Sequence, residues 1–211
     1  MIGFGYERFT KARVEAFSDG VFAIIVTLLV LDIKIPALKT EDNQAMFSSI
    51  IAILPIIFIW ITSFLITCVI WMNHHRIMGM INHIDSGIFW LNNLLLMASS
   101  LIPFPTAMVG AHPTLAMATT FYGICLMFTA LCFVFMRLYI LRTPGMLKKE
   151  VTRESFWAGT RRTLFFGCSF YLIGAAVSWI DTRISFVVFF FIPLYFILPT
   201  YRSAAIKNQD N

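Results

Sequence analysis

The chain alternates long apolar stretches with short polar breaks, a pattern that predicts helices crossing a lipid bilayer. A helix needs roughly 20 apolar residues to cross the ~30 Å hydrocarbon layer, because it rises ~1.5 Å per residue. The stretches that meet or approach this length are about 13–32, 46–75, 86–109, 114–141, 163–180 and 184–200. We therefore predict an all-α polytopic membrane protein whose six transmembrane helices form one domain, 1–211.

Prolines and polar runs mark the expected interruptions. Pro55 is expected to kink the second span, and the pair Pro103 and Pro105 lies near the end of the third. A tight turn is predicted at 110–113, between the third and fourth spans. The connection 142–162 is basic and is expected to be partly amphipathic. No internal repeat is visible.

Composition supports the membrane assignment. Hydrophobic residues make up 59% of the chain and charged residues only 13%, whereas soluble domains have about 45–50% and about 25%. The net charge of +5 would suggest a nucleic-acid partner in a soluble protein, but 13 of the 16 Lys and Arg fall on one side of the six-span arrangement. The positive-inside rule then predicts that both termini are cytoplasmic. We expect a multi-pass protein of the plasma membrane that is surrounded by lipid and binds no nucleic acid.

The sequence offers little support for an enzyme or a metal site. No catalytic triad, phosphate loop or zinc-peptidase motif is present, and the four cysteines all lie within apolar runs. His74, His75 and His83 lack the further ligands that a metal would need. We expect no enzymatic activity, no metal and no cofactor.

Polar residues distinguish the first span from the others. Ionisable groups inside a span are costly and usually mark an ion pathway or a contact between helices. Asp19 lies roughly 20 Å along the helix axis from Asp32, which places it within the span. Asp32 is expected at the extracellular end, either as an ordinary helix-end carboxylate or as part of an acidic ring at a pore mouth.

The opposite face of this span is apolar. At about 100° per residue, Ile24, Leu28 and Leu31 lie within about 60° of one another. Thr27 adds one hydroxyl to this stripe, and the projection also places Arg13 on it, below Gly20, where a bend is possible. The stripe can face lipid, or in a cyclic oligomer it can face the axis as rings that gate ions by dewetting. Spacing leaves both possibilities open.

The motif Arg13-x-x-x-Phe17-Ser18-Asp19-Gly20 resembles the signature on the first helix of the transmembrane protein 175 family. These are endolysosomal potassium channels of animals and their prokaryotic homologues, and their six-span layout also matches. Animal members carry two six-helix repeats. This chain has one, as in the prokaryotic form, which is a homotetramer with a fourfold pore. The resemblance implies a potassium-preferring cation channel. The alternatives are a proton or cation leak pathway, a secondary transporter, a membrane-embedded enzyme and a purely structural protein.

The resemblance also implies roles for residues of the first span. Ile24 would form the narrowest pore ring, with Leu28 and Leu31 as further rings, and Thr27 matches a hydroxyl linked to potassium preference. The signature would tie the first span to the second and third. The expected partners are Trp71, either His74 or His75, Trp90 and Asn93. The chain lacks a Thr-Val-Gly-Tyr-Gly sequence, so selectivity by rings of filter carbonyls is excluded.

Overall fold

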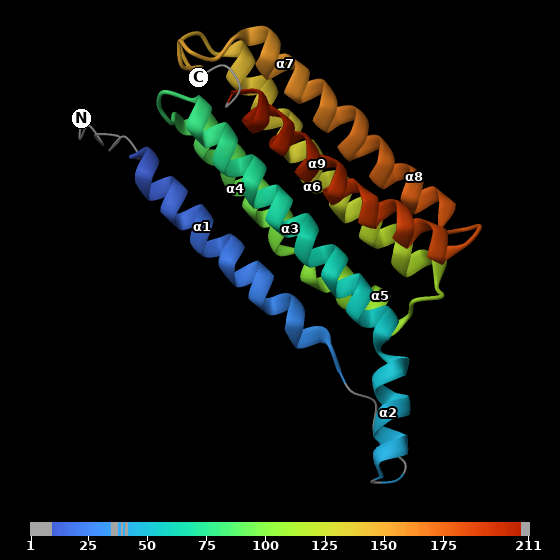
Figure 1. Ribbon diagram of the computed structural model, residues 1–211. Helices are drawn as coiled ribbons and strands as arrows, with labels where there is room; N and C mark the ends of the chain where they lie inside the picture. The colour runs from blue at the N-terminus through green and yellow to red at the C-terminus, as the bar shows by residue number, and fades with distance from the viewer. Residues whose placement is uncertain (1–9, 35–37, 39, 41, 208–211) are drawn as a thin grey trace, which may run out of the picture.

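The protein is an elongated bundle of long helices (Figure 1). The computed structural model describes residues 10–34, 38, 40 and 42–207, excluding the side chains of Asp32 and of 198–207. The described helices are α1 (Lys11–Leu28), 3₁₀ helix η1 (Leu29–Asp32), α2 (Asn43–Ala52), α3 (Leu54–Met80), α4 (Ser86–Ser100), α5 (Pro103–Ala111), α6 (Ala116–Arg142), α7 (Arg153–Arg162), π-helix η2 (Thr163–Ser169), α8 (Phe170–Val177) and α9 (Thr182–Lys207). The predicted all-α architecture is confirmed.

The first helix packs along one edge of the bundle, against α3 and α4 (Figure 1). Its buried residues are Val14, Ser18, Phe22, Ile25 and Leu29. Their spacing of three or four residues forms one helical stripe, as expected for a helix with a single packed face. The predicted span 13–32 is therefore helical, although its last turn tightens into η1.

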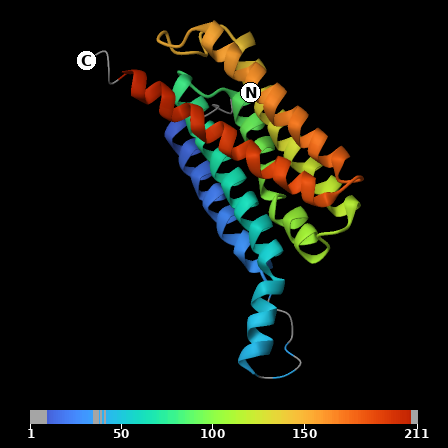
Figure 2. The ribbon, with the colours of Figure 1, turned by 45° about the vertical axis from the view of Figure 1, so that its right-hand side comes forward.

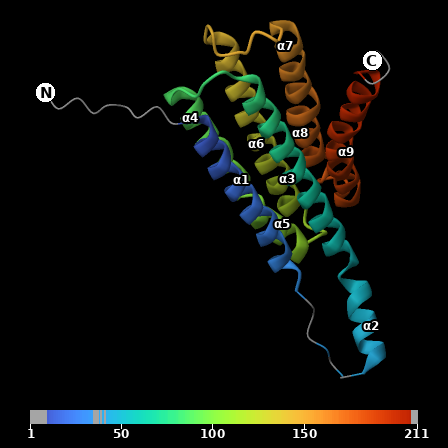
Figure 3. The same cartoon turned by 60° about the vertical axis from the view of Figure 1, so that its left-hand side comes forward.

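The second predicted span is two helices rather than one kinked helix. The break is at Ile53, a buried turn residue between α2 and α3, two positions before Pro55. Proline has no N–H to donate, and its ring clashes with the carbonyl four residues earlier, so a continuous helix is disfavoured. Asp42 caps the start of α2 by accepting a hydrogen bond from the Ala45 N–H at 2.7 Å. Figure 3 shows α2 projecting beyond the rest of the bundle.

The third predicted span is also interrupted. Helix α4 begins at an Asp85 cap, whose carboxylate accepts from the Ile88 N–H at 2.8 Å. A turn then precedes α5, which begins at Pro103, and α5 continues to Ala111. The proline pair therefore starts a helix instead of ending one, because proline is well tolerated in the first turn.

The C-terminal helices pack closely around α6. The ring of Phe189 on α9 occupies the space that a side chain at Gly174 would need, so glycine allows α8 and α9 to approach closely. Helix α9 lies beside α8 and crosses α3 (Figure 2). The predicted loop 142–162 is partly helix: α7 continues through η2 into α8 as one rod.

One end of the bundle gathers the loops and most of the described basic residues. The Lys11 ammonium donates to the Ile81 carbonyl at 3.2 Å, and the Asn82 side chain donates to the Gly145 and Leu147 carbonyls, both at 3.0 Å. The start of α1 and the end of α9 also lie at this end (Figures 1 and 3). A chain whose ends share one side crosses the bilayer an even number of times.

Four helical segments are long and apolar enough to span a membrane: Lys11–Leu31, Leu54–Met80, Ser86–Ala111 and Ala116–Arg142. The chain is therefore a multi-pass membrane protein. The apolar part of α9, Thr182–Ile197, is shorter, and η2 with α8 covers the fifth predicted span. The count of six crossings remains a prediction.

Candidate functional site

Helix α1 has one packed face and one uncovered face. The residues predicted to share a stripe all lie on the uncovered face: Ile24 is 59% exposed, Leu28 43% and Leu31 68%. Figure 1 shows α1 at the edge of the bundle, with α3 and α4 on its other side. Large apolar side chains exposed along a whole helix face require lipid or another subunit to cover them.

Thr27 lies on this uncovered face. Its hydroxyl donates to the Ile24 carbonyl of the preceding turn at 2.9 Å. Since the proton is used inside the helix, the hydroxyl oxygen presents its lone pairs outward. An exposed oxygen of this kind can accept a hydrogen bond or contact a cation. Arg13, which the projection placed on the same stripe, is also exposed.

The packed face of α1 carries a buried polar cluster. The Asn92 amide donates to the Ser18 hydroxyl at 3.1 Å, and Ser18 donates to the Val14 carbonyl at 2.8 Å. His74 lies 2.7 Å from the Asn92 amide oxygen through Nε2. An amide oxygen only accepts, so Nε2 of His74 is the donor. The cluster links α1, α3 and α4 where none of its three side chains exceeds 1% exposure.

This cluster corrects one predicted residue and resolves one open choice. The asparagine that contacts α1 is Asn92, not the predicted Asn93, because Asn92 lies on the buried face of α4 and Asn93 is turned about 100° from it. Trp90 is 69% exposed, also away from α1. Of the two candidate histidines, His74 is in the buried cluster, and His75 is exposed.

A second pair of signature contacts lies on the exposed side. Trp71 donates its indole N–H to the Asp19 carboxylate at 2.8 Å, and its ring lies 6.2 Å from that of His75. Asp19, which the sequence places within the first span, is exposed in the protomer. Phe17, at 59% exposure, is also uncovered. Two signature residues therefore make different kinds of contact: Ser18 bonds to Asn92 in the buried cluster, and Asp19 bonds to Trp71 on the exposed side.

Sequence reasoning missed a further polar link deep in the bundle. The Ser63 hydroxyl lies 2.9 Å from that of Thr106 and 2.8 Å from that of Tyr122, joining α3, α5 and α6. The sequence does show hydroxyl residues within the apolar spans, but their spacing along the chain does not show which of them form hydrogen bonds with one another. Within the described part of the chain, no group of three or more His, Cys, Asp or Glu could hold a metal ion. The Asp32 side chain lies outside the described residues.

Comparison with known proteins gives consistent similarities. Residues 13–103 match the profile of a family described as "Endosomal/lysosomal potassium channel TMEM175". The chain is 38% identical over 198 residues to a potassium channel of Chamaesiphon minutus, covering 91% of this chain and 96% of that one. It is 30% identical over 193 residues to a potassium channel of a Chryseobacterium strain, covering 92% and 95%.

A solved structure resembles the fold described above. It is the crystal structure of a lysosomal potassium-selective channel TMEM175 homolog from Chamaesiphon minutus, with a TM-score of 0.79 and 35% sequence identity. The similarity covers 90% of this chain and 97% of the other. The arrangement of helices is therefore shared almost from end to end.

Proposed function

Because this chain belongs to the TMEM175 family, we propose that it is a potassium-preferring cation channel whose pore is lined by α1 from each of four identical subunits. The observation that carries the proposal is the division of α1 into two faces. One face is fixed to α3 and α4 by the buried Ser18–Asn92–His74 cluster. The other leaves Ile24, Leu28 and Leu31 uncovered.

The uncovered stripe would form a hydrophobic constriction. Four stripes around an axis stack as three aliphatic rings spanning roughly 10 Å from Ile24 to Leu31. Carbon atoms cannot replace the water that an ion sheds, so the barrier to conduction depends on the width and polarity of this neck. Thr27 supplies the hydroxyl oxygen of the stripe, and we assign the preference for potassium to it.

The signature residues would hold the pore helix in place without touching ions. Trp71 already satisfies Asp19 with a hydrogen bond, and a carboxylate held in this way suits a structural role. Its exposure in the protomer is compatible with contact to a neighbouring subunit in a tetramer. Phe17 and Trp90 are also exposed in the protomer.

We also propose six crossings of the plasma membrane with both termini in the cytoplasm. The gathering of basic residues at the end where α1 begins and α9 ends supports this orientation. The remaining two crossings would be made by the continuous rod of α7, η2 and α8 and by the separate helix α9. The family is one of ion channels, so we assign no enzymatic activity.

Ion flux through liposomes tests the proposal. Wild-type protein should conduct potassium down its gradient, and Ile24→Asn should increase that flux by wetting the neck. Ile173→Asn is the matched control, since Ile173 is 48% exposed on α8, away from α1. If both variants behave alike, or if neither changes flux in an assembled protein, α1 does not line the pore.

A saturable, coupled flux would instead favour a secondary transporter, for which the interruption between α4 and α5 is the supporting feature.

A further inference from the structure

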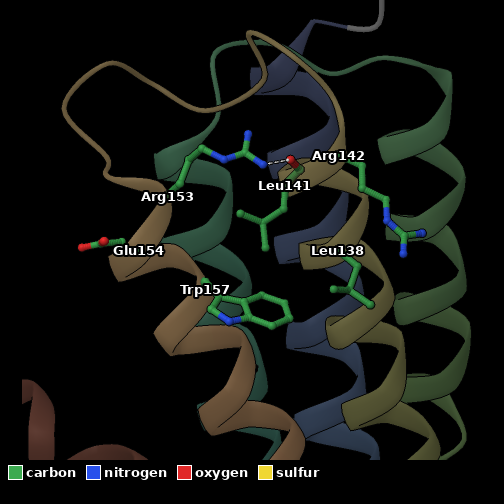
Figure 4. A pocket seen from close by; sticks show the side chains of 6 residues that line it. All are labelled: Leu138, Leu141, Arg142, Arg153, Glu154 and Trp157. Carbon is green, nitrogen blue, oxygen red and sulfur yellow. Dashed lines mark hydrogen bonds between the residues drawn. The ribbon is translucent and has the colours of Figure 1, made fainter.

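We infer that a hollow between α6 and α7 binds the headgroup of an anionic phospholipid from the membrane leaflet at the basic end of the bundle. The hollow measures about 440 Å³ and lies beside the last turns of α6 and the first turns of α7. Its lining residues are Leu138, Leu141, Arg142, Arg153, Glu154 and Trp157 (Figure 4). None of these residues belongs to the proposed pore.

Two arginines give the hollow its charge. Figure 4 shows Arg142 and Arg153 on opposite sides of Leu141. Arg153 donates one hydrogen bond, from Nη2 to the Leu141 carbonyl at 2.7 Å. This bond fixes the guanidinium at the rim and leaves its other N–H groups available for a phosphate oxygen, since an arginine has five donors in a planar fork. Arg142 is exposed at the end of α6.

The single acidic residue does not neutralise this pair. Figure 4 shows the Glu154 carboxylate directed away from Arg153 and out of the hollow. Glu154 lies in the first turn of α7, where the positive end of the helix dipole stabilises a carboxylate. The hollow therefore combines an apolar floor with a net positive rim, which matches a lipid with an anionic headgroup.

Apolar side chains continue from the hollow along the outside of the bundle. Trp157 is 47% exposed, and tryptophan favours the depth of lipid headgroups because its ring is apolar and its N–H is polar. Phe135 on α6 and Leu164 in η2 are each 48% exposed; Phe135 is one helical turn from Leu138, and Leu164 is two turns from Trp157. A phospholipid can thus place its phosphate at the Arg153 guanidinium, with Arg142 adding positive charge from the other side of Leu141, and its acyl chains along these residues. A free phosphate would use only the rim.

Basic pockets between transmembrane helices on the cytoplasmic side commonly bind anionic headgroups. The assignment to the cytoplasmic leaflet rests on the proposed topology. The binding itself does not depend on that topology or on conduction, so it is tested on detergent-purified full-length protein.

Native mass spectrometry with added phosphatidylglycerol or phosphatidylcholine measures the binding. We expect wild-type protein to retain phosphatidylglycerol preferentially, and each of Arg142→Gln and Arg153→Gln to weaken its retention by about fivefold, the usual attraction per basic residue. The matched control is Lys149→Gln with Arg161→Gln, two exposed basic residues at the same end but outside the hollow. This control should retain the lipid.

The contrary outcomes are equally specific. Equal loss in the control pair would mean general charge attraction, and equal retention of the two lipids would mean no headgroup selection. Displacement of phosphatidylglycerol by millimolar inorganic phosphate would show that the site recognises the anion and not the lipid. Each of these results overturns the inference. Arg142→Gln keeps the test valid if Arg153→Gln fails to fold, because the Arg142 side chain donates no hydrogen bond within the described residues.

Discussion

Trp71 on α3 donates a hydrogen bond to Asp19 on α1 at 2.8 Å, on a face of the protomer that its own helices leave exposed. A bond of this kind is weak in water, but it strengthens when a partner subunit excludes solvent. In the proposed tetramer, this bond would orient α1 relative to α3.

We predict that Asp19 and Trp71 act as one unit in tetramer stability. Asp19→Ala and Trp71→Phe should each lower the thermal stability of the assembled protein, by about 1–3 kcal/mol for the lost charge-assisted bond. The double variant should lose little more than either single one, because both remove the same bond. Size-exclusion chromatography with thermal unfolding measures this. Glu150→Ala, an exposed charge outside α1 and α3, is the control, and fully additive effects would contradict the prediction.

Two adjacent asparagines on α4 provide a sharp test of the buried cluster. Asn92→Leu should destabilise the protein by about 1–3 kcal/mol or more, because it leaves the Ser18 hydroxyl and the His74 ring without their shared partner in a dry site. Asn93→Leu places the same side chain one position away, on a half-buried face, and should have a much smaller effect. Thermal unfolding in detergent measures both. Equal losses would mean that the cluster does not hold α1.

The contrast between Asn92 and Asn93 also shows what the sequence could predict. Periodicity predicted α1 and the separation of its two faces, because about 100° per residue accumulates little error over a few turns. The same rule fails between helices, since the rotation of α4 relative to α1 depends on packing that no single segment encodes. The sequence therefore named the correct helices for the contact but the wrong asparagine.

The interruptions were harder to predict for a related reason. Pro55 indicated that the helix of the second span is interrupted. The length of the segment before it did not show whether α2 and α3 form one kinked helix or two separate helices. The π-helical segment η2 contains no proline that could mark it in the sequence, and it packs against α6. The length of an apolar stretch similarly indicated where a transmembrane segment lies, but not whether its helix is long enough to cross the whole bilayer.

The proposed topology can be tested with a single added cysteine at the C-terminus. We expect a membrane-impermeant maleimide to leave it unlabelled in intact cells and to label it after permeabilisation, since the positive-inside rule predicts that the basic end of the bundle faces the cytoplasm. A cysteine placed at Thr114, between α5 and α6, should show the opposite pattern. Labelling of the C-terminal cysteine from outside would contradict an even number of crossings with cytoplasmic ends.

Asp32 is the last residue of the 3₁₀ helix η1 and directly follows Leu31, the last aliphatic residue of the stripe. If four copies surround the pore mouth, their charge raises the local concentration of cations without dehydrating them. Asp32→Asn should then reduce inward current at low ionic strength and have little effect near 1 M salt, where screening shortens to about 3 Å. Conductance measured across a salt series tests this. A reduction that is the same at every salt concentration would place the carboxylate away from the mouth.

The hydroxyl of Thr27 is the most direct test of selectivity. Its proton is committed to the Ile24 carbonyl at 2.9 Å, so what it offers to a passing ion is an oxygen lone pair. Thr27→Val keeps the shape and removes that oxygen. We expect conduction to persist while the preference for potassium over sodium falls about two- to tenfold, the range that corresponds to about 0.5–1.5 kcal/mol for one polar contact.

Thr27→Ser keeps the oxygen and should retain most of the preference, which separates the loss of the hydroxyl from a change in packing. Single-channel recording under bi-ionic conditions measures the reversal potential of each variant. If the valine and serine variants share the wild-type reversal potential, Thr27 faces lipid or protein, and the stripe that contains it is not the wall of the pore.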